Sequence, residues 1–165
     1  MGGSVMQGSL SEVDRLVFGC LSRLVWASIE RGSMMIGWVG DIEHLTLENE
    51  SFRRVLFTGP HAQLTVMRLG PGEDIGKEVH ADRDQFLRIE EGQARIEFGR
   101  DEDGVDESHD VSDDWAIVVP AGTWHNVINT GTGELKLYSL YAPPEHPDRT
   151  VHRTKADAEA AEHAE

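Results

Sequence analysis

Four polar residues, in two short stretches of the sequence, have the types and the spacing to hold a metal ion. Glu78 and His80 are two positions apart, so on a strand their side chains point to the same side. Residues 81–84 form a polar turn, and Gln85 begins the next predicted strand, where its side chain can approach that pair. His125 follows a second tight turn, far along the chain. Two such hairpins, converging, would place Glu78, His80, Gln85 and His125 around one divalent ion.

The donor types indicate which ions and which ligands such a site would take. Two imidazoles, one carboxylate and one amide oxygen suit Fe(II), Mn(II), Ni(II) or Zn(II). A single carboxylate leaves the loaded site net positive, which attracts an anionic oxygen of a substrate. An octahedral ion would keep two adjacent positions open for water, oxygen or a chelating substrate. The alternative is a hydrogen-bonded His–Glu pair in a pocket that holds no ion.

The residues that surround these positions resemble the two signature motifs of the cupin superfamily. The family's first motif reads Gly, five residues, His-x-His, three or four residues, Glu, six residues, Gly. The matching positions here are Gly72, Glu78, His80, Gln85 and Gly92. The second motif reads Pro-x-Gly, two residues, His, three residues, Asn, and its positions are filled by Pro120, Gly122, His125 and Asn129. The resemblance covers residues 36–141.

The first motif keeps the family's spacing but departs from its usual ligands. Where cupins usually have His, His and Glu, this chain has Glu78, His80 and Gln85. Mixed sets of Gln, His and Glu are similar to those of some sugar-phosphate isomerases of the superfamily, so the chain looks like a small, single-domain, phosphomannose-isomerase-like cupin. Asp82 is also two positions from His80 and is the alternative carboxylate ligand.

The resemblance implies a small metal-dependent enzyme, an oxygenase, isomerase or lyase, that acts on a small polar metabolite. Tyr141 ends a predicted strand that lines the pocket and is the candidate substrate contact. The alternative is a cupin that binds or senses a small molecule without catalysis, which the Glu and Gln substitutions favour. Single-domain cupins commonly pair, so we also expect a homodimer formed through the segment before Gly59.

Short apolar or alternating runs, separated by turn residues, predict an all-β fold after Ile36. The predicted strands are Arg54–Thr58, Gln63–Leu69, Gln85–Glu90, Ala94–Phe98, Ala116–Val119, Asn126–Asn129 and Glu134–Tyr141. Strands at this spacing are typical of a sandwich or barrel, and with the resemblance they predict a jelly-roll β-barrel over residues 35–145. Asp101–Asp114 contains eight acidic residues in fourteen and is predicted to be a solvated loop.

The two ends of the chain differ from the predicted barrel. Apolar residues with a 3.6-residue period predict a helix over residues 11–30, within an N-terminal extension of residues 1–34. This extension is either an added packing element or a gene-start artefact, with translation beginning at Met34 or Met35. Residues 146–165 form a predicted C-terminal arm with a short helix from Lys155. If the arm folds over the barrel mouth, it brings His146 or His152 to the pocket.

Composition excludes several classes of partner. Thirty acidic residues against fifteen Lys and Arg give a net charge of −15, which disfavours nucleic acid and anionic membranes. No apolar run reaches the roughly 18 residues of a membrane span, and the N-terminus lacks the basic region of a secretory signal. The single cysteine excludes a disulfide framework within the chain. We therefore expect a cytoplasmic protein whose partners are small molecules.

We predict that deletion of residues 1–33 leaves a folded barrel. Residues 1–34 carry three acids and three arginines, whereas the whole net charge of −15 lies in the rest of the chain, which marks a boundary. Urea unfolding of the truncated and full-length proteins measures the effect. A loss of more than about 3 kcal/mol, the scale of a large core truncation, would show that the segment belongs to the core.

Overall fold

The computed structural model describes residues 37–162, and the fold lies in a compact unit that begins at Val39. The predictions for residues 1–34 therefore lie outside the described residues. The elements are α2 (Ile42–Leu47), β1 (Arg53–Thr58), β2 (Gln63–Leu69), β3 (Asp84–Glu91), β4 (Gln93–Gly99), β5 (Glu107–Ser112), β6 (Ala116–Val119), β7 (Trp124–Asn129), β8 (Leu135–Ala142), β9 (Val151–His152) and α3 (Lys155–Glu162). No helix among residues 37–162 has the length and hydrophobicity needed to cross a membrane.

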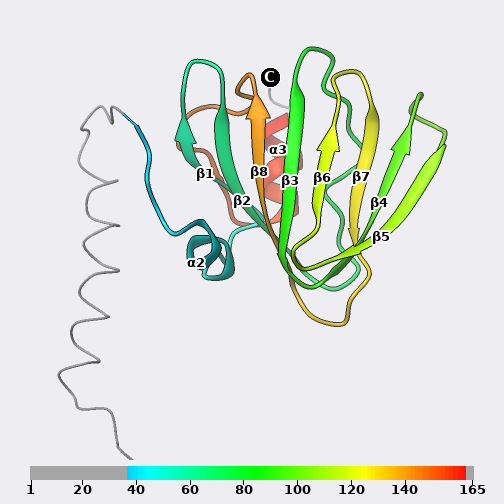
Figure 1. Cartoon of the computed structure of the whole chain (residues 1–165), viewed down its shortest axis with the longest axis horizontal. Coiled ribbons are helices and arrows are strands. Elements are labelled where there is room, and N and C mark those ends of the chain that lie inside the picture. The colour runs from blue at the N-terminus through cyan, green and yellow to red at the C-terminus, as the bar shows by residue number, and fades with distance from the viewer. Residues whose placement is uncertain (1–36, 163–165) are drawn as a thin grey trace, which may run out of the picture. The chain divides into compact units, whose positions relative to one another are not determined.

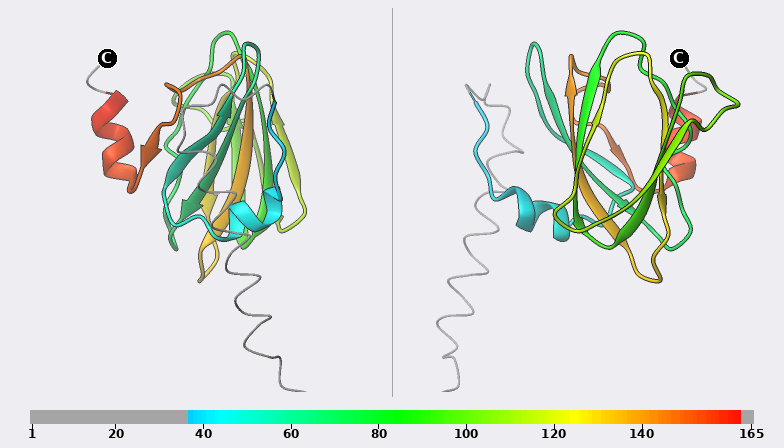
Figure 2. Two further views of the ribbon diagram at one scale, coloured as in Figure 1. Left: turned by 90° about the vertical axis from the view of Figure 1, so that its left-hand side faces the viewer. Right: turned by 45° about the vertical axis from the view of Figure 1, so that its right-hand side comes forward.

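Two antiparallel sheets face each other and form the predicted jelly-roll barrel (Figures 1 and 2). One sheet has the strand order β6-β3-β8-β2-β1-β9, and the other has the order β5-β4-β7. Helix α2 packs against β8, β3 and β2 of the larger sheet. The edge of β1, in the segment that we expect to form a dimer contact, is covered at Arg53 and Arg54 by β9. The assembly itself stays a prediction.

The inside of the barrel is apolar at one end and polar at the other. On β3, buried side chains repeat every second residue, as expected for a strand with one face in the core, whereas β2 and β8 each also bury a run of three consecutive residues. Leu69, Leu135 and Leu137 are fully buried in the apolar half. The first inward row of β3, β8 and β2 is instead Gln85, Tyr141 and Gln63, each at most 1% exposed. This polar end is where the predicted ligands lie.

The acidic stretch 101–114 was predicted as a loop, and this prediction is wrong for its second half. Residues 107–112 form β5, which pairs along its length with β4. Only Val111 is buried, and the first four residues of the strand are exposed. Because β5 is an edge strand with most of its surface in solvent, its residues are as polar as those of a loop, and the sequence does not distinguish the two. Negative side chains on such an edge also oppose pairing with other chains.

Two glycines of the motifs occupy positions that a side chain would disturb. Gly92 lies between β3 and β4 with φ +101°, and a Cβ there would lie 2.6 Å from the carbonyl oxygen of Glu134. Gly122 has φ +77° in the turn before β7, and its N–H donates to the carbonyl oxygen of His80 at 2.7 Å. The second contact joins the turn of the second motif to the main chain of the first.

The asparagine of the second motif has a structural role. Asn129 is 1% exposed, and its Nδ2 lies 2.9–3.0 Å from the carbonyl oxygens of Leu69, Gly70 and Gly133. Its Oδ1 accepts from the N–H of Gly131 at 2.9 Å. One side chain therefore joins the end of β2 to the turn between β7 and β8.

We predict that Asn129→Ala lowers the free energy of unfolding by about 2–3 kcal/mol, because it leaves several buried main-chain groups without a partner. The matched control is Asn126→Ala on the same strand, where the buried Oδ1 has no hydrogen-bond partner among the described residues. That change should cost less than about 1 kcal/mol. Urea unfolding measures both, and equal losses would contradict the role assigned to Asn129.

Candidate metal centre

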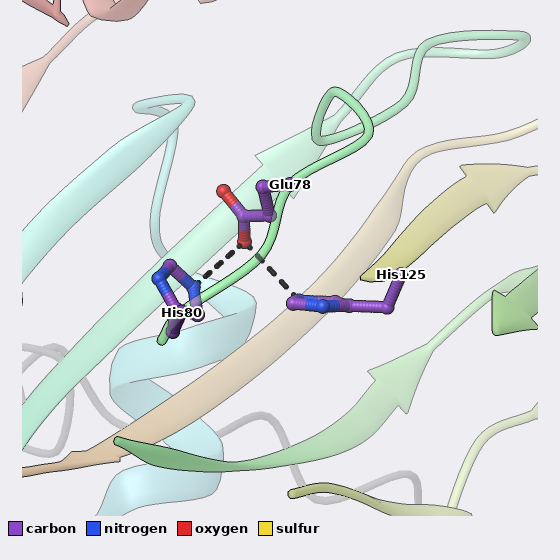
Figure 3. Close-up of side chains that lie close together, drawn as sticks. All are labelled: Glu78, His80 and His125. Carbon is purple, nitrogen blue, oxygen red and sulfur yellow. Dashed lines mark hydrogen bonds and ion pairs between the residues drawn. The ribbon is translucent and has the colours of Figure 1, made fainter. Parts of the chain in front are cut away.

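Three of the four predicted ligands meet at the polar end of the barrel. Glu78, His80 and His125 offer ligand atoms that all lie within 4.8 Å of one another. Glu78 lies between the two imidazoles, with Oε1 at 3.3 Å from His80 Nε2 and at 3.3 Å from His125 Nε2 (Figure 3). The carboxylate and both Nε2 atoms therefore face a common point.

Main-chain contacts, rather than a regular strand, position the first pair. The segment that carries Glu78 and His80 lies outside the regular strands and makes only isolated pairing with β7. The N–H of Glu78 donates to His125 O at 3.0 Å, and the N–H of His125 donates to Glu78 O at 2.9 Å. This reciprocal pair sets Glu78 directly opposite His125.

Each imidazole has an acceptor at Nδ1, which leaves Nε2 for the cluster. His125 is fully buried, and its Nδ1 lies 3.1 Å from the carbonyl oxygen of Thr123. Because a carbonyl oxygen only accepts, this contact places the ring hydrogen on Nδ1, and Nε2 of the neutral ring has a bare lone pair. His80 Nδ1 similarly lies 3.4 Å from Glu145 Oε2. Metal-binding histidines typically have such a partner on the other nitrogen.

The residues fit a cation better than they fit one another. His125 Nε2 is buried and makes no hydrogen bond of acceptable geometry, although it lies 3.3 Å from a carboxylate oxygen. A lone pair that faces a carboxylate is unfavourable unless a proton or a metal ion lies between them. Two imidazoles and one carboxylate are also ligands that divalent transition metals take readily.

The surroundings favour the charged form of both members of the first pair. Burial by itself would raise the pKa of Glu78, but His125 and His80, when each carries a hydrogen on Nε2, outweigh it and hold that pKa well below its usual range. Burial would likewise lower the pKa of His80, but the contact with Glu78 outweighs it and raises that pKa. Glu78 is therefore a carboxylate at neutral pH, the form that binds metal.

Gln85, the fourth predicted ligand, lies on the inner face of β3, opposite Tyr141. Its Nε2 donates to Ser139 Oγ at 3.1 Å, while its buried Oε1 has no partner among the described residues. Its role as a ligand stays a prediction. Asp82, the alternative carboxylate, has a side chain that is 70% exposed and paired with Arg83, so it does not join the cluster.

Tyr141, the predicted substrate contact, lies behind the cluster. It is 1% exposed, and its ring packs edge-on against His80, with a centroid distance of 5.6 Å, and against His146, at 5.2 Å. Burial raises the pKa of Tyr141, so the hydroxyl stays protonated at neutral pH. A direct contact between Tyr141 and a substrate stays a prediction.

The C-terminal arm folds back to the cluster and builds a cavity beside it. The cavity has a volume of about 280 Å³ and is lined on the barrel side by Arg53, Glu78 and His80, and on the arm side by residues that include Glu145, His146 and His152. Gln63 fixes the arm, because its Oε1 accepts from the N–H of His146 at 2.9 Å and its Nε2 donates to the same residue's carbonyl oxygen at 2.7 Å. The sequence left this arrangement open.

Glu145 and Arg53 are site residues that sequence reasoning missed. Glu145 lies beside His80 and forms an ion pair with Arg83 at 2.5 Å. Arg53 was placed just before a predicted strand, with no sign that its side chain faces inward. The available signal was weak in both cases, since a lone acid in a Pro-rich segment and an arginine before an apolar run are ordinary surface patterns.

Comparison with known proteins shows the family. Residues 65–141 match the family described as Cupin domain. The chain is 58% identical over 125 residues to the protein YrkC of Bacillus subtilis (strain 168), covering 76% of this chain and 67% of that one. It is 45% identical over 111 residues to the protein L612 of Acanthamoeba polyphaga mimivirus, covering 67% and 68%. The solved structure of BH2720 from Bacillus halodurans superposes with a TM-score of 0.75 at 52% identity, covering 79% of this chain and 97% of that one.

We predict that metal affinity falls as the pH is lowered from 8 to 6. The pKa of His80 in the metal-free protein is raised above the ordinary 6.5, so protons begin to compete with the ion above that pH. Below the pKa of His80, affinity should fall about tenfold per pH unit, because one proton is displaced. Calorimetric titration with Mn(II) in buffers of different ionisation enthalpy counts the protons released. An affinity that is constant from pH 6 to pH 8 would contradict a role for His80 as a ligand.

Proposed function

The chain belongs to the cupin family, and from this premise we propose that it is a metal-binding cupin that acts as a small metal-dependent enzyme on a small polar metabolite. The observation that carries the proposal is the convergence of Glu78, His80 and His125 within 4.8 Å at the polar end of the barrel. The cavity of about 280 Å³ that Glu78 and His80 line supports a small ligand.

The protein's own residues would divide the work of such a site. Glu78, His80 and His125 hold the ion, and Gln85 is the proposed fourth ligand. Thr123 and Glu145 orient the two imidazoles through their Nδ1 atoms. A bound divalent ion supplies Lewis acidity, which polarises a ligand carbonyl, or redox chemistry if the ion is iron. The arm lines one side of the cavity.

One observation favours a second candidate, a cupin that binds a small molecule without a catalytic ion. Glu78 lies at contact distance from both imidazoles, so a protonated His80 can satisfy the carboxylate with no metal present. Metal content after purification without an affinity tag separates the two candidates. One ion per chain supports the enzyme, whereas an empty site with retained ligand binding supports the binding module.

We predict that His80→Ala and His125→Ala each weaken Mn(II) and Zn(II) binding by more than about 100-fold, since loss of an outer partner alone typically costs 10–100-fold. Glu78→Gln should also weaken binding, because it removes the only carboxylate of the cluster. Asp82→Asn is the matched control, since its exposed side chain pairs with Arg83, and it should leave the affinity unchanged. Calorimetric titration of each metal-free variant measures the affinity. Equal affinities for all four variants would show that these residues do not form a metal site.

A further substitution, measured by the same titration, tests whether Gln85 is a metal ligand. Gln85→Glu restores the residue type that cupins usually have at this position and adds a negative charge to the polar end. If the Gln85 oxygen is a ligand, the change tightens divalent metal binding. An unchanged or weaker affinity would restrict the set of ligands to three.

A further inference from the structure

The cavity beside the metal cluster has one wall that the proposed metal centre does not use. Arg53 and His146 line this wall, together with His152, which β9 places opposite Arg53. The two histidines come from the arm and Arg53 comes from β1. None of these three side chains belongs to the metal cluster.

Arg53 brings a permanent positive charge into the interior of the barrel. It is 1% exposed, and burial of a charge is unfavourable unless the charge is compensated. Arg53 also interacts with other groups of the protein, so its charge rather than a spare donor is what favours an anion. The two carboxylates that line the cavity are occupied elsewhere, since Glu78 faces the imidazoles and Glu145 pairs with Arg83 at 2.5 Å. A divalent ion on Glu78 would leave the cavity net positive.

His146 contributes a neutral ring on a main chain that is held in place. Its main chain is held by Gln63 at both the N–H and the carbonyl oxygen. Burial, followed by the charge of Arg53, lowers the pKa of His146 to about 3, so the ring is neutral at pH 7. Its Nε2 is buried and has no hydrogen-bond partner among the described residues, which is an unfavourable arrangement for a polar atom. A ligand in the cavity can supply the missing partner.

We propose that this cavity binds a small carboxylate, whose oxygens accept a hydrogen bond from His146 Nε2 and face the charge of Arg53, while its other end reaches the ion held by Glu78 and His80. The inference rests on the proposed metal centre and names the class of ligand for it. The volume of about 280 Å³ lies at the lower limit of small-molecule sites, roughly 300–1,000 Å³, and suits a metabolite of a few carbon atoms.

The test compares two probes that differ in charge and little in shape, lactate and its neutral amide, lactamide. Each is titrated into the full-length protein loaded with Co(II), whose visible spectrum reports a change at the ion. We expect lactate to bind at least about tenfold more tightly than lactamide, because a carboxylate accepts a stronger hydrogen bond than a neutral amide and is attracted by the charge of Arg53. If the two bind alike, the proposal is wrong.

Substitutions of His146 and Arg53 test whether these two residues cause the preference for lactate over lactamide. His146→Ala should weaken lactate binding about tenfold, and His146→Gln, which keeps an N–H donor, should restore part of it. Arg53→Met should abolish the preference for lactate, whereas Arg53→Lys, which keeps the charge, should retain it. His109→Ala, on the exposed strand β5, is the matched control and should change nothing. If Arg53→Met does not fold by circular dichroism, the two His146 variants decide, and unchanged lactate binding in His146→Ala overturns the proposal.

The experiment also distinguishes failure of the proposed metal site from failure of the proposed carboxylate site. If Co(II) does not bind, the proposed function is wrong, and lactate is then titrated into the metal-free protein with changes in the NMR spectrum as the readout. A preference for lactate that depends on His146 and Arg53 would support the cavity without the ion. If lactate binding to the metal-free protein does not depend on His146 and Arg53, the proposal that the cavity binds a carboxylate is wrong as well.

Discussion

The reciprocal pair of main-chain hydrogen bonds between Glu78 and His125 is the contact on which the candidate site depends. It joins a segment that is not a regular strand to β7, at 3.0 and 2.9 Å. Two further bonds continue the pairing, from the N–H of Ile75 to Val127 O and from the N–H of Asn129 to Glu73 O. The first motif therefore runs antiparallel to the second motif's strand. Two parts of the sequence that are 47 positions apart present their side chains to one point because their backbones are paired there.

This arrangement makes the barrel polar at one end, and a polar interior must be satisfied. Gln63, Gln85 and Tyr141 form an inward row in which each is at most 1% exposed. Gln63 bonds Thr58 on β1 and both main-chain groups of His146. The arm that follows β8 thus completes the hydrogen bonding of the barrel as well as the wall of the cavity. Buried polar groups of this kind are rarely left without partners, so the arm is part of the fold rather than a loose tail.

The sequence predicted what depends on local pattern and missed what depends on contacts across the fold. Alternation identified the strands with an inner face, and motif spacing identified the three residues that converge. Strand β5 was missed because an edge strand in solvent has no buried face to give it a period. Glu145 was missed because its partner His80 lies 65 positions away and nothing in the Pro-rich arm indicates where it folds. Arg53 lies opposite the buried Met67 of β2, and β9 and the arm contribute to its burial, which the local sequence does not indicate.

The charge of the protein and the charge of the cavity act in opposite directions on the two ligands. A net charge of −15 draws divalent cations toward the surface and repels anions, over distances set by a screening length of about 8–10 Å at ordinary ionic strength. With an ion bound at Glu78 the balance inside the cavity would reverse, since Arg53 and the ion would face the space while Glu145 is paired with Arg83. A bound ion would therefore strengthen the attraction of the cavity for an anion against the field of the surface. Added salt screens that field, so it weakens metal capture and eases anion entry, and the two equilibria depend on ionic strength with opposite sign.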